Sequence, residues 1–139
     1  MAIAGFGFTK INVEKKDIVK GKINIKNNMG IVNLETTEVP FGDIKQKVLK
    51  FIFEYKTVYE PNVGSIVLEG NLLDIQDEKT IKQVMDVWKK EKKIDNKILE
   101  PVINSLLGRC NVESLILSRE VNLPPPVPLP KVQVAQQSK

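Results

Sequence analysis

Prolines crowd the end of this chain and restrict what it can form there. Pro124, Pro125, Pro126, Pro128 and Pro130 all fall between residues 124 and 130. Each proline ring fixes φ and removes a backbone N–H, so the stretch suits neither a helix interior nor a central strand. We therefore predict that residues 1–123 form one compact domain and that residues 124–139 form an extended arm. Such an arm is better suited to docking a partner than to chemistry.

Alternating apolar and polar residues predict four strands before the arm. The expected strands cover residues 3–13, 23–34, 48–59 and 65–73. In the first, Gly5 and Gly7 indicate a bulge or the close approach of a neighbouring backbone. In the second, residues 27–30 predict a turn in mid-strand. Short turns between strands favour an antiparallel sheet with one face on the core.

The pattern then changes to a helical period. Ile81, Val84, Met85 and Trp88 fall on one face of a helix, which either Asp74 or Asp77 is placed to cap. An apolar stripe about two residues wide follows, and its N-cap is expected at Asp95. Its members are Ile98, Leu99, Val102, Ile103, Leu106, Leu107 and Cys110.

The region after that stripe predicts a third, short helix. Asn111 is placed to cap it, and Val112, Leu115, Ile116 and Arg119 are expected to lie on it. With strands first and helices after, the fold class is α+β. We expect a four-stranded antiparallel sheet followed by two or three helices and the Pro-rich C-terminal arm.

Composition removes most kinds of catalytic site. The chain has no histidine and a single cysteine, Cys110. A Ser-His or Cys-His nucleophile is therefore impossible within one chain, and a histidine or thiolate metal site is excluded. No phosphate loop, dinucleotide fingerprint or calcium loop is present either. We expect no enzyme activity, no catalytic residue, no metal and no cofactor.

The N-terminus lacks a basic region followed by a long apolar run, and no run approaches the roughly 18 apolar residues of a membrane span. The expected location is therefore the cytoplasm, without membrane insertion.

The net charge of +4 raises the question of a nucleic-acid partner. Only Arg109 and Arg119 are arginines, and the lysines are spread along the chain. One cluster follows the first predicted helix: Lys89, Lys90, Lys92 and Lys93. Solvation and the helix dipole explain this cluster most simply, and contact with phosphate is the alternative.

Two segments resemble the SecB family of export and holdase chaperones. The closer match is residues 98–109, which begin Ile-Leu-Glu-Pro, followed by Leu115, Leu117 and the Val-Asn-Leu-Pro-Pro-Pro of residues 121–126. SecB proteins have a similar Ile-Leu-x-Pro helix start, an apolar helix, and then a segment containing Leu and Pro. Residues 67–73 resemble the last sheet strand of that family in their position before the helices.

The resemblance implies a homodimer or homotetramer whose grooves bind unfolded polypeptide without ATP. It makes six apolar residues candidates for the groove or for the seam between subunits, although core packing is the simpler interpretation of the aromatic ones. These candidates are Phe51, Phe53, Tyr55, Trp88, Val102 and Leu106.

Charge sets this chain apart from typical SecB proteins, which are acidic and contact the translocation motor through an acidic sheet surface. The basic chain here fits better a holdase outside the standard export route, for example one paired with a specific client such as a toxin–antitoxin system. Two alternatives remain. One is a basic accessory protein of a ribonucleoprotein, with the lysine cluster on RNA phosphates. The other is a small subunit of a larger protein complex, with the arm as its docking element.

Overall fold

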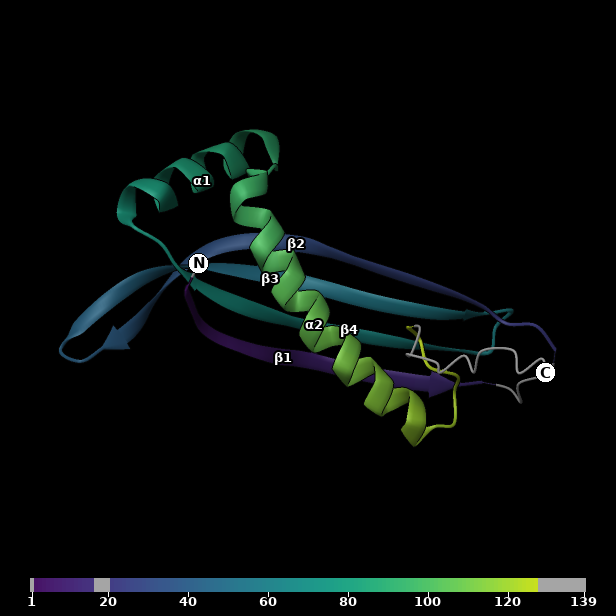
Figure 1. Cartoon of the computed structure of the whole chain (residues 1–139). Helices are drawn as coiled ribbons and strands as arrows, with labels where there is room; N and C mark the ends of the chain where they lie inside the picture. Colours follow the sequence, from purple (N-terminus) through teal and green to yellow (C-terminus); the bar gives the residue numbers. More distant parts are fainter. Residues whose placement is uncertain (1, 17–20, 128–139) are drawn as a thin grey trace, which may run out of the picture.

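The computed structural model describes residues 2–16 and 21–127, which form four strands followed by two helices. The elements are β1 (Ala2–Lys15), β2 (Asn24–Phe41), β3 (Ile44–Glu60), β4 (Gly64–Ile75), α1 (Glu78–Glu91) and α2 (Asn96–Glu120). All strand pairs are antiparallel, and the spatial order is β1-β4-β3-β2. Figure 1 shows α2 lying across one face of the sheet and α1 near one end. The predicted α+β fold is confirmed.

Strand β3 lies inside the sheet and sets the difference between its two faces. Phe51, Phe53 and Tyr55 are fully buried, as the alternation of the sequence predicts. This core face is the one that both helices cover. The opposite face, here called the open face, carries Lys50, Glu54 and other half-exposed residues of β3.

Helix α2 covers the core face with residues spaced four apart. Val102, Leu106 and Cys110 have no solvent exposure and join the core cluster with the β3 aromatics. Full burial of a Val or Leu side chain contributes about 1.5–3 kcal/mol, so this stripe is a main source of stability. Pro101 lies in the second turn of the helix, where it removes one i→i−4 hydrogen bond, the one to the Lys97 carbonyl.

Both helices begin at an aspartate. Asp77 Oδ1 accepts a hydrogen bond from the Thr80 amide at 2.7 Å. Hydrogen bonding to the side chain and the amide of Thr80 holds the pKa of Asp77 below its usual range. Asp95 Oδ1 accepts a hydrogen bond from the Lys97 amide at 3.1 Å. Of the two candidate caps of α1, Asp77 rather than Asp74 is therefore the one used.

Two predicted breaks are wrong. The expected turn at residues 27–30 is continuous strand within β2. The third helix does not exist as a separate element, because α2 runs through Asn111 to Glu120. In both places an asparagine has a distant partner instead of a local cap or turn: the Thr57 hydroxyl donates to Asn27 at 2.6 Å, and the Tyr55 hydroxyl donates to Asn111 at 3.3 Å. Long-range contacts therefore override the local preference of asparagine.

The bulge expected in the first strand is present. The register of β1 on β4 shifts between Ile3 and Gly5 and again between Phe8 and Lys10. The second shift places Ile11 and Val13 opposite core-face residues of β4, on the same side as Phe6 and Phe8.

The hairpin of β2 and β3 projects beyond the body of the molecule, as Figure 1 shows on the left. Its turn is at Gly42 and Asp43, where Gly42 has a φ of +65°. Beside the turn, Phe41 is 62% exposed and Ile44 is 71% exposed. The tip is therefore an apolar surface that the sequence analysis did not identify.

Gly70 of β4 lies where the backbones of β1 and β4 approach closely. A Cβ at this position meets the Gly7 carbonyl oxygen, the Phe8 Cα at 2.9 Å and the Phe53 Cζ at 3.0 Å. We expect Gly70→Ala to lower the free energy of unfolding by about 1–3 kcal/mol, because the neighbouring backbone has to move. Urea denaturation measures this change.

The matched control is Gly7→Ala in the paired strand, because a Cβ there meets no atom within 4 Å. Its effect should stay within about 0.5 kcal/mol. Equal destabilisation by the two substitutions would contradict the close approach at Gly70.

Candidate functional site

Five of the six residues considered for a polypeptide groove or subunit seam lie inside the single chain. Phe51, Phe53, Val102 and Leu106 have no exposure, and Tyr55 is 1% exposed. They form the contact between the sheet and α2, so the core-packing interpretation describes their position. Their role in binding stays a prediction. The sixth residue, Trp88, is half-buried and lies elsewhere.

Trp88 lines a groove beside β2, here called the edge groove. Its walls come from β2, from the end of α1 and from the first half of α2, and its volume is about 480 Å³. The lining residues are Met29, Gly30, Ile31, Trp88, Lys92, Lys93, Ile94, Asn96, Leu99 and Ile103. The six apolar side chains among them are all half-buried. The structure thus leaves a continuous apolar margin between strand and helix.

The edge groove adjoins a free strand edge. Within the described residues β2 pairs only with β3, so alternate residues of β2 direct their backbone N–H and C=O groups away from the sheet. Met29 and Ile31 pair with Tyr55 and Phe53, which places them on the core face, toward α2. Hydrogen-bonding groups and apolar side chains therefore lie next to each other along this edge.

The opposite margin of the core face carries the aromatic side chains of β1. The Phe6 ring stacks on the Phe53 ring with centroids 5.6 Å apart, and Phe8 makes an edge contact with Phe53 at 6.2 Å. The Arg109 guanidinium of α2 lies over the Phe6 ring, 4.7 Å from its centroid. Phe6 and Phe8 are half-buried, as Met29 and Ile31 are, so the two margins differ in their neighbours: Arg109 lies beside β1, and Trp88 and Lys92 lie beside β2.

Two of the four lysines of the predicted cluster, Lys92 and Lys93, lie at the rim of the edge groove. Lys92 ends α1 in a left-handed conformation with φ of 56°, and its amide donates to the Trp88 carbonyl at 2.9 Å. Its ammonium lies over the Trp88 ring, 5.1 Å from the centroid. Lys93 also lines the groove, whereas Lys89 lines a separate cavity beside Lys47 and Asp86. Lys90 is exposed in the last turn of α1.

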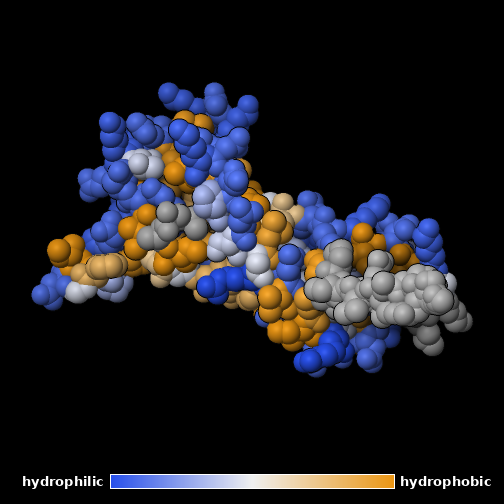
Figure 2. All heavy atoms as spheres, in the orientation of Figure 1, coloured by the Kyte–Doolittle hydropathy of each residue, from blue (hydrophilic) through white to orange (hydrophobic). Residues whose placement is uncertain are grey.

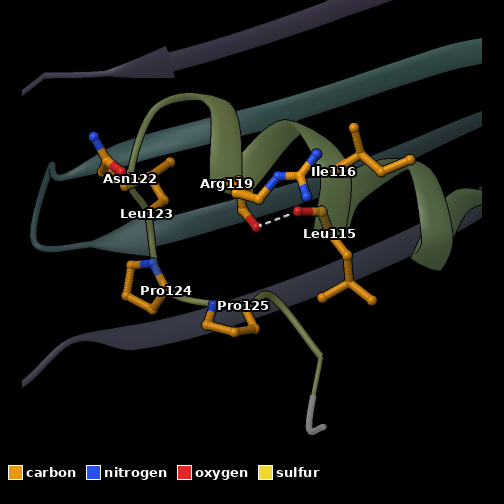
Figure 3. Close-up of a pocket in the computed structure, with 8 residues that line it drawn as sticks. Leu115, Ile116, Arg119, Asn122, Leu123, Pro124 and Pro125 are labelled. Carbon is orange, nitrogen blue, oxygen red and sulfur yellow. Dashed lines mark hydrogen bonds between the residues drawn. The ribbon is translucent and has the colours of Figure 1, made fainter.

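A second concave region lies at the end of α2, here called the C-terminal pocket (Figure 3). It has a volume of about 700 Å³, and its lining residues are Leu115, Ile116, Ser118, Arg119, Asn122, Leu123, Pro124 and Pro125. Figure 2 shows apolar atoms toward the C-terminal half of α2 and hydrophilic atoms over the outer side of α1. The C-terminal pocket has a loop and a helix as walls but no strand-edge residue among its lining.

The described start of the arm is anchored to the chain's own sheet. The Tyr59 hydroxyl donates to the Pro124 carbonyl at 2.6 Å, and the Asn27 side-chain amide donates to the Pro126 carbonyl at 2.8 Å. Leu123 is buried beside them. Pro125 is exposed, and Pro128 and Pro130 lie outside the described residues. Docking of a partner by this arm stays a prediction.

Two weakly acidic side chains, Tyr59 and Cys110, are buried. Burial raises the pKa of Tyr59 to about 12, with a smaller contribution from Tyr55, and it raises the pKa of Cys110 to about 12, with a smaller contribution from Glu113. The Cys110 thiol therefore stays protonated at neutral pH, as expected of a buried apolar residue. Among residues 2–16 and 21–127 no cluster of three or more metal-ligating side chains is present.

Part of the edge groove is predictable from the sequence. Trp88 is a candidate residue for the polypeptide groove or the subunit seam, and Leu99 and Ile103 belong to the predicted helix stripe. Met29, Ile31 and Ile94 were missed as site residues. The width of the helix stripe exceeds what one buried face needs, which indicates an apolar surface beside the helix but does not identify these three residues.

No protein-family model matches the sequence, and no curated protein matches it either. Among solved structures, the fold is similar to that of a SecB-like chaperone of Mycobacterium tuberculosis in complex with a ChAD peptide from an antitoxin. The two chains are 12% identical, the TM-score is 0.49, and the alignment covers 97% of this chain and 92% of that one. At this identity and TM-score, membership of the SecB family stays a prediction for this chain.

In the part of the chain that the structure describes, neither helix is both long and apolar enough to cross a membrane.

The buried Tyr59 hydroxyl predicts a pH dependence. Its pKa is about 12 in the folded chain and has its ordinary value of 10.0 in the unfolded chain, so its contribution to stability is complete below pH 10 and is lost as the pH rises toward 12. The Cys110 thiol adds a loss of the same sign that begins near its ordinary pKa of 9.0. The free energy of unfolding should therefore decrease steadily over this range.

Urea denaturation at several pH values from neutral to about 11 measures this decrease. Tyr59→Phe should lose stability less steeply above pH 10 than the natural chain, because one of the two titrating groups is gone. Identical slopes for the two proteins would show that Tyr59 does not keep its proton in the folded state.

Proposed function

We propose that this protein binds non-native polypeptides as a holdase, without catalysing a reaction and without ATP. The observation that carries the proposal is the free edge of β2 beside the half-buried apolar lining of the edge groove. An extended segment of a client adds to the sheet at β2 and places alternate side chains in the groove.

The geometry suits clients of many sequences. Main-chain hydrogen bonds to a strand edge do not depend on the side chains of the client, whereas a folded protein has already paired its own backbone groups. Met29 adds a flexible side chain that adapts to different client residues. Selectivity for unfolded over folded chains therefore follows from the backbone, and affinity follows from the apolar lining.

In this proposal the buried candidate residues position the groove lining and do not contact the client. Phe53 and Tyr55 pair with Ile31 and Met29 and fix their positions in the sheet. Val102 and Leu106 hold α2 on the core face, which positions Leu99 and Ile103 at the groove. Of the six candidates for the groove or the subunit seam, Trp88 contacts the client. The other five hold the residues of the groove in position.

A homodimer or homotetramer remains part of the proposal. The open face of the sheet, the edge of β1 and the hairpin tip with Phe41 and Ile44 offer surfaces to a second copy. Light scattering of the purified protein measures the oligomeric state alongside client binding.

The ribonucleoprotein alternative has one observation in its favour, which is the lysine cluster at the end of α1. In the described residues Lys89, Lys90, Lys92 and Lys93 form no ion pair, so their charges are available to an anionic partner. RNA binding of this kind should weaken steeply as the salt concentration rises. Client capture through the apolar lining should be much less sensitive to salt.

A charge placed in the edge groove tests the holdase proposal. Ile103 is half-buried in the groove, and Val112 of the same helix is 58% exposed and is not among the groove residues. We expect Ile103→Asp to weaken binding of a permanently unfolded polypeptide by about tenfold or more, because the bound segment loses an apolar partner and meets a buried charge. Fluorescence anisotropy of the labelled polypeptide measures the affinity.

Val112→Asp is the matched control and should bind as the natural chain does. Circular dichroism confirms that both variants are folded, and the natural, folded counterpart of the unfolded polypeptide serves as the competing ligand. Equal weakening by the two substitutions, or equal affinity for folded and unfolded polypeptide, would contradict the proposal.

A further inference from the structure

We infer that the edge groove selects extended segments in which acidic side chains accompany apolar ones. The inference rests on the proposed function, because it names the class of segment that the groove takes. It is drawn from the charges around the lining, which are of one sign.

The charged side chains that line the edge groove are both cationic. They are Lys92 and Lys93, and the rest of the lining is apolar or uncharged. The ion pairs found in the described residues lie elsewhere: Lys10 with Glu69 and Lys26 with Glu60 on the open face, and Arg119 with Glu120 at the end of α2. In the part of the chain that the structure describes, these two ammonium groups form no ion pair, so the charge at the groove favours an anionic occupant.

Asp95, in the connection between the helices, forms no ion pair with the rim lysines in the described residues. It accepts a hydrogen bond from the Lys97 amide at the start of α2. It lines an adjoining cavity that shares Lys93, Ile94 and Asn96 with the edge groove. The nearest acidic side chain of the helix connection is therefore used as a helix cap and leaves both ammonium groups without an ion pair.

Lys92 and Trp88 place the cation directly beside an apolar surface. The ammonium lies 5.1 Å from the centroid of the indole, and the indole is part of the groove lining. In an extended segment, residues two apart face the same side at a spacing of about 7 Å. An apolar residue in the groove thus has a same-face neighbour at the distance of the rim, where a carboxylate pairs with Lys92 or Lys93.

The same arrangement disfavours basic segments. A lysine or arginine at the rim meets two uncompensated ammonium groups, and such like-charge contacts discriminate between partners. The groove therefore separates apolar segments with acidic neighbours from apolar segments with basic neighbours, although both expose the same hydrophobic side chains when unfolded.

Three unstructured peptides with identical apolar residues test the inference. They carry Glu, Gln or Lys two positions from each apolar residue, on the same face of the extended segment, and a fourth peptide keeps Glu but replaces the apolar residues by Ser. Calorimetry at low salt should give the order Glu, Gln, Lys, with about fivefold between successive peptides, since a few exposed ion pairs contribute at this level. At about 150 mM salt the differences should shrink while binding of the Gln peptide persists.

The double variant Lys92→Gln and Lys93→Gln should bind the three apolar peptides with equal affinity. The matched control is Lys45→Gln with Lys56→Gln, which makes the same change in net charge at two exposed lysines outside the groove. The control should keep the order of the natural chain. A loss of the order in both double variants would overturn the inference, because the net charge of the protein would then be its cause.

The remaining outcomes separate the inference from the proposed function. Equal affinity of the natural chain for the Glu, Gln and Lys peptides would overturn the inference and leave the holdase proposal in place. Binding of none of the apolar peptides would overturn the holdase proposal itself. Equal affinity for the Glu peptide with and without its apolar residues would overturn the inference in favour of a general polyanion surface.

Discussion

The structure depends on one helix covering one face of a four-stranded sheet. Helix α2 is held there by Val102, Leu106 and Cys110, which pack on the aromatic residues of β3. A helix is about 10–12 Å wide with its side chains, whereas four strands spaced about 4.8 Å apart span roughly 15 Å or more. A single helix therefore leaves apolar margins on the core face, and the residues at those margins decide what the protein can bind.

The two margins of the core face differ in the side chains that lie beside them. On the β1 side, the half-buried Phe6 and Phe8 contact each other, and Arg109 lies over the Phe6 ring. On the β2 side, Met29 and Ile31 stay half-buried, and the end of α1 contributes Trp88 and a cationic rim rather than a cover. The candidate site is thus the part of the core face that the fold leaves incomplete.

Local patterns were enough to predict much of this fold. The parity of Phe51, Phe53 and Tyr55 identified the core face of β3, Asp95 identified the start of α2, and the start of α1 was narrowed to Asp74 or Asp77. The continuity of β2 through Asn27 and of α2 through Asn111 was not predictable in the same way. Their partners Thr57 and Tyr55 lie 30 and 56 residues away in the sequence, so no local window contains the deciding contact.

The site was harder to predict than the fold for a related reason. The apolar stripe of α2 is wider than one buried face, and the sequence places Leu99, Ile103, Val102 and Leu106 in it without distinguishing them. The crossing of α2 over β3 decides that Val102 and Leu106 are buried while Leu99 and Ile103 line the groove. The aromatic residues of β3 were the most conspicuous candidates. Because α2 covers them, they belong to the core beneath the groove and not to its lining.

Amide hydrogen exchange of the protein with and without a bound unfolded polypeptide tests the central claim most directly. If the client adds to the free edge of β2, the amides of β2 that point away from β3 near Met29, Gly30 and Ile31 should exchange more slowly in the complex. The edge of β1 should be unchanged. Slower exchange confined to β1, to the hairpin tip or to the C-terminal pocket would contradict the account, because the groove beside β2 would then not be where the polypeptide binds.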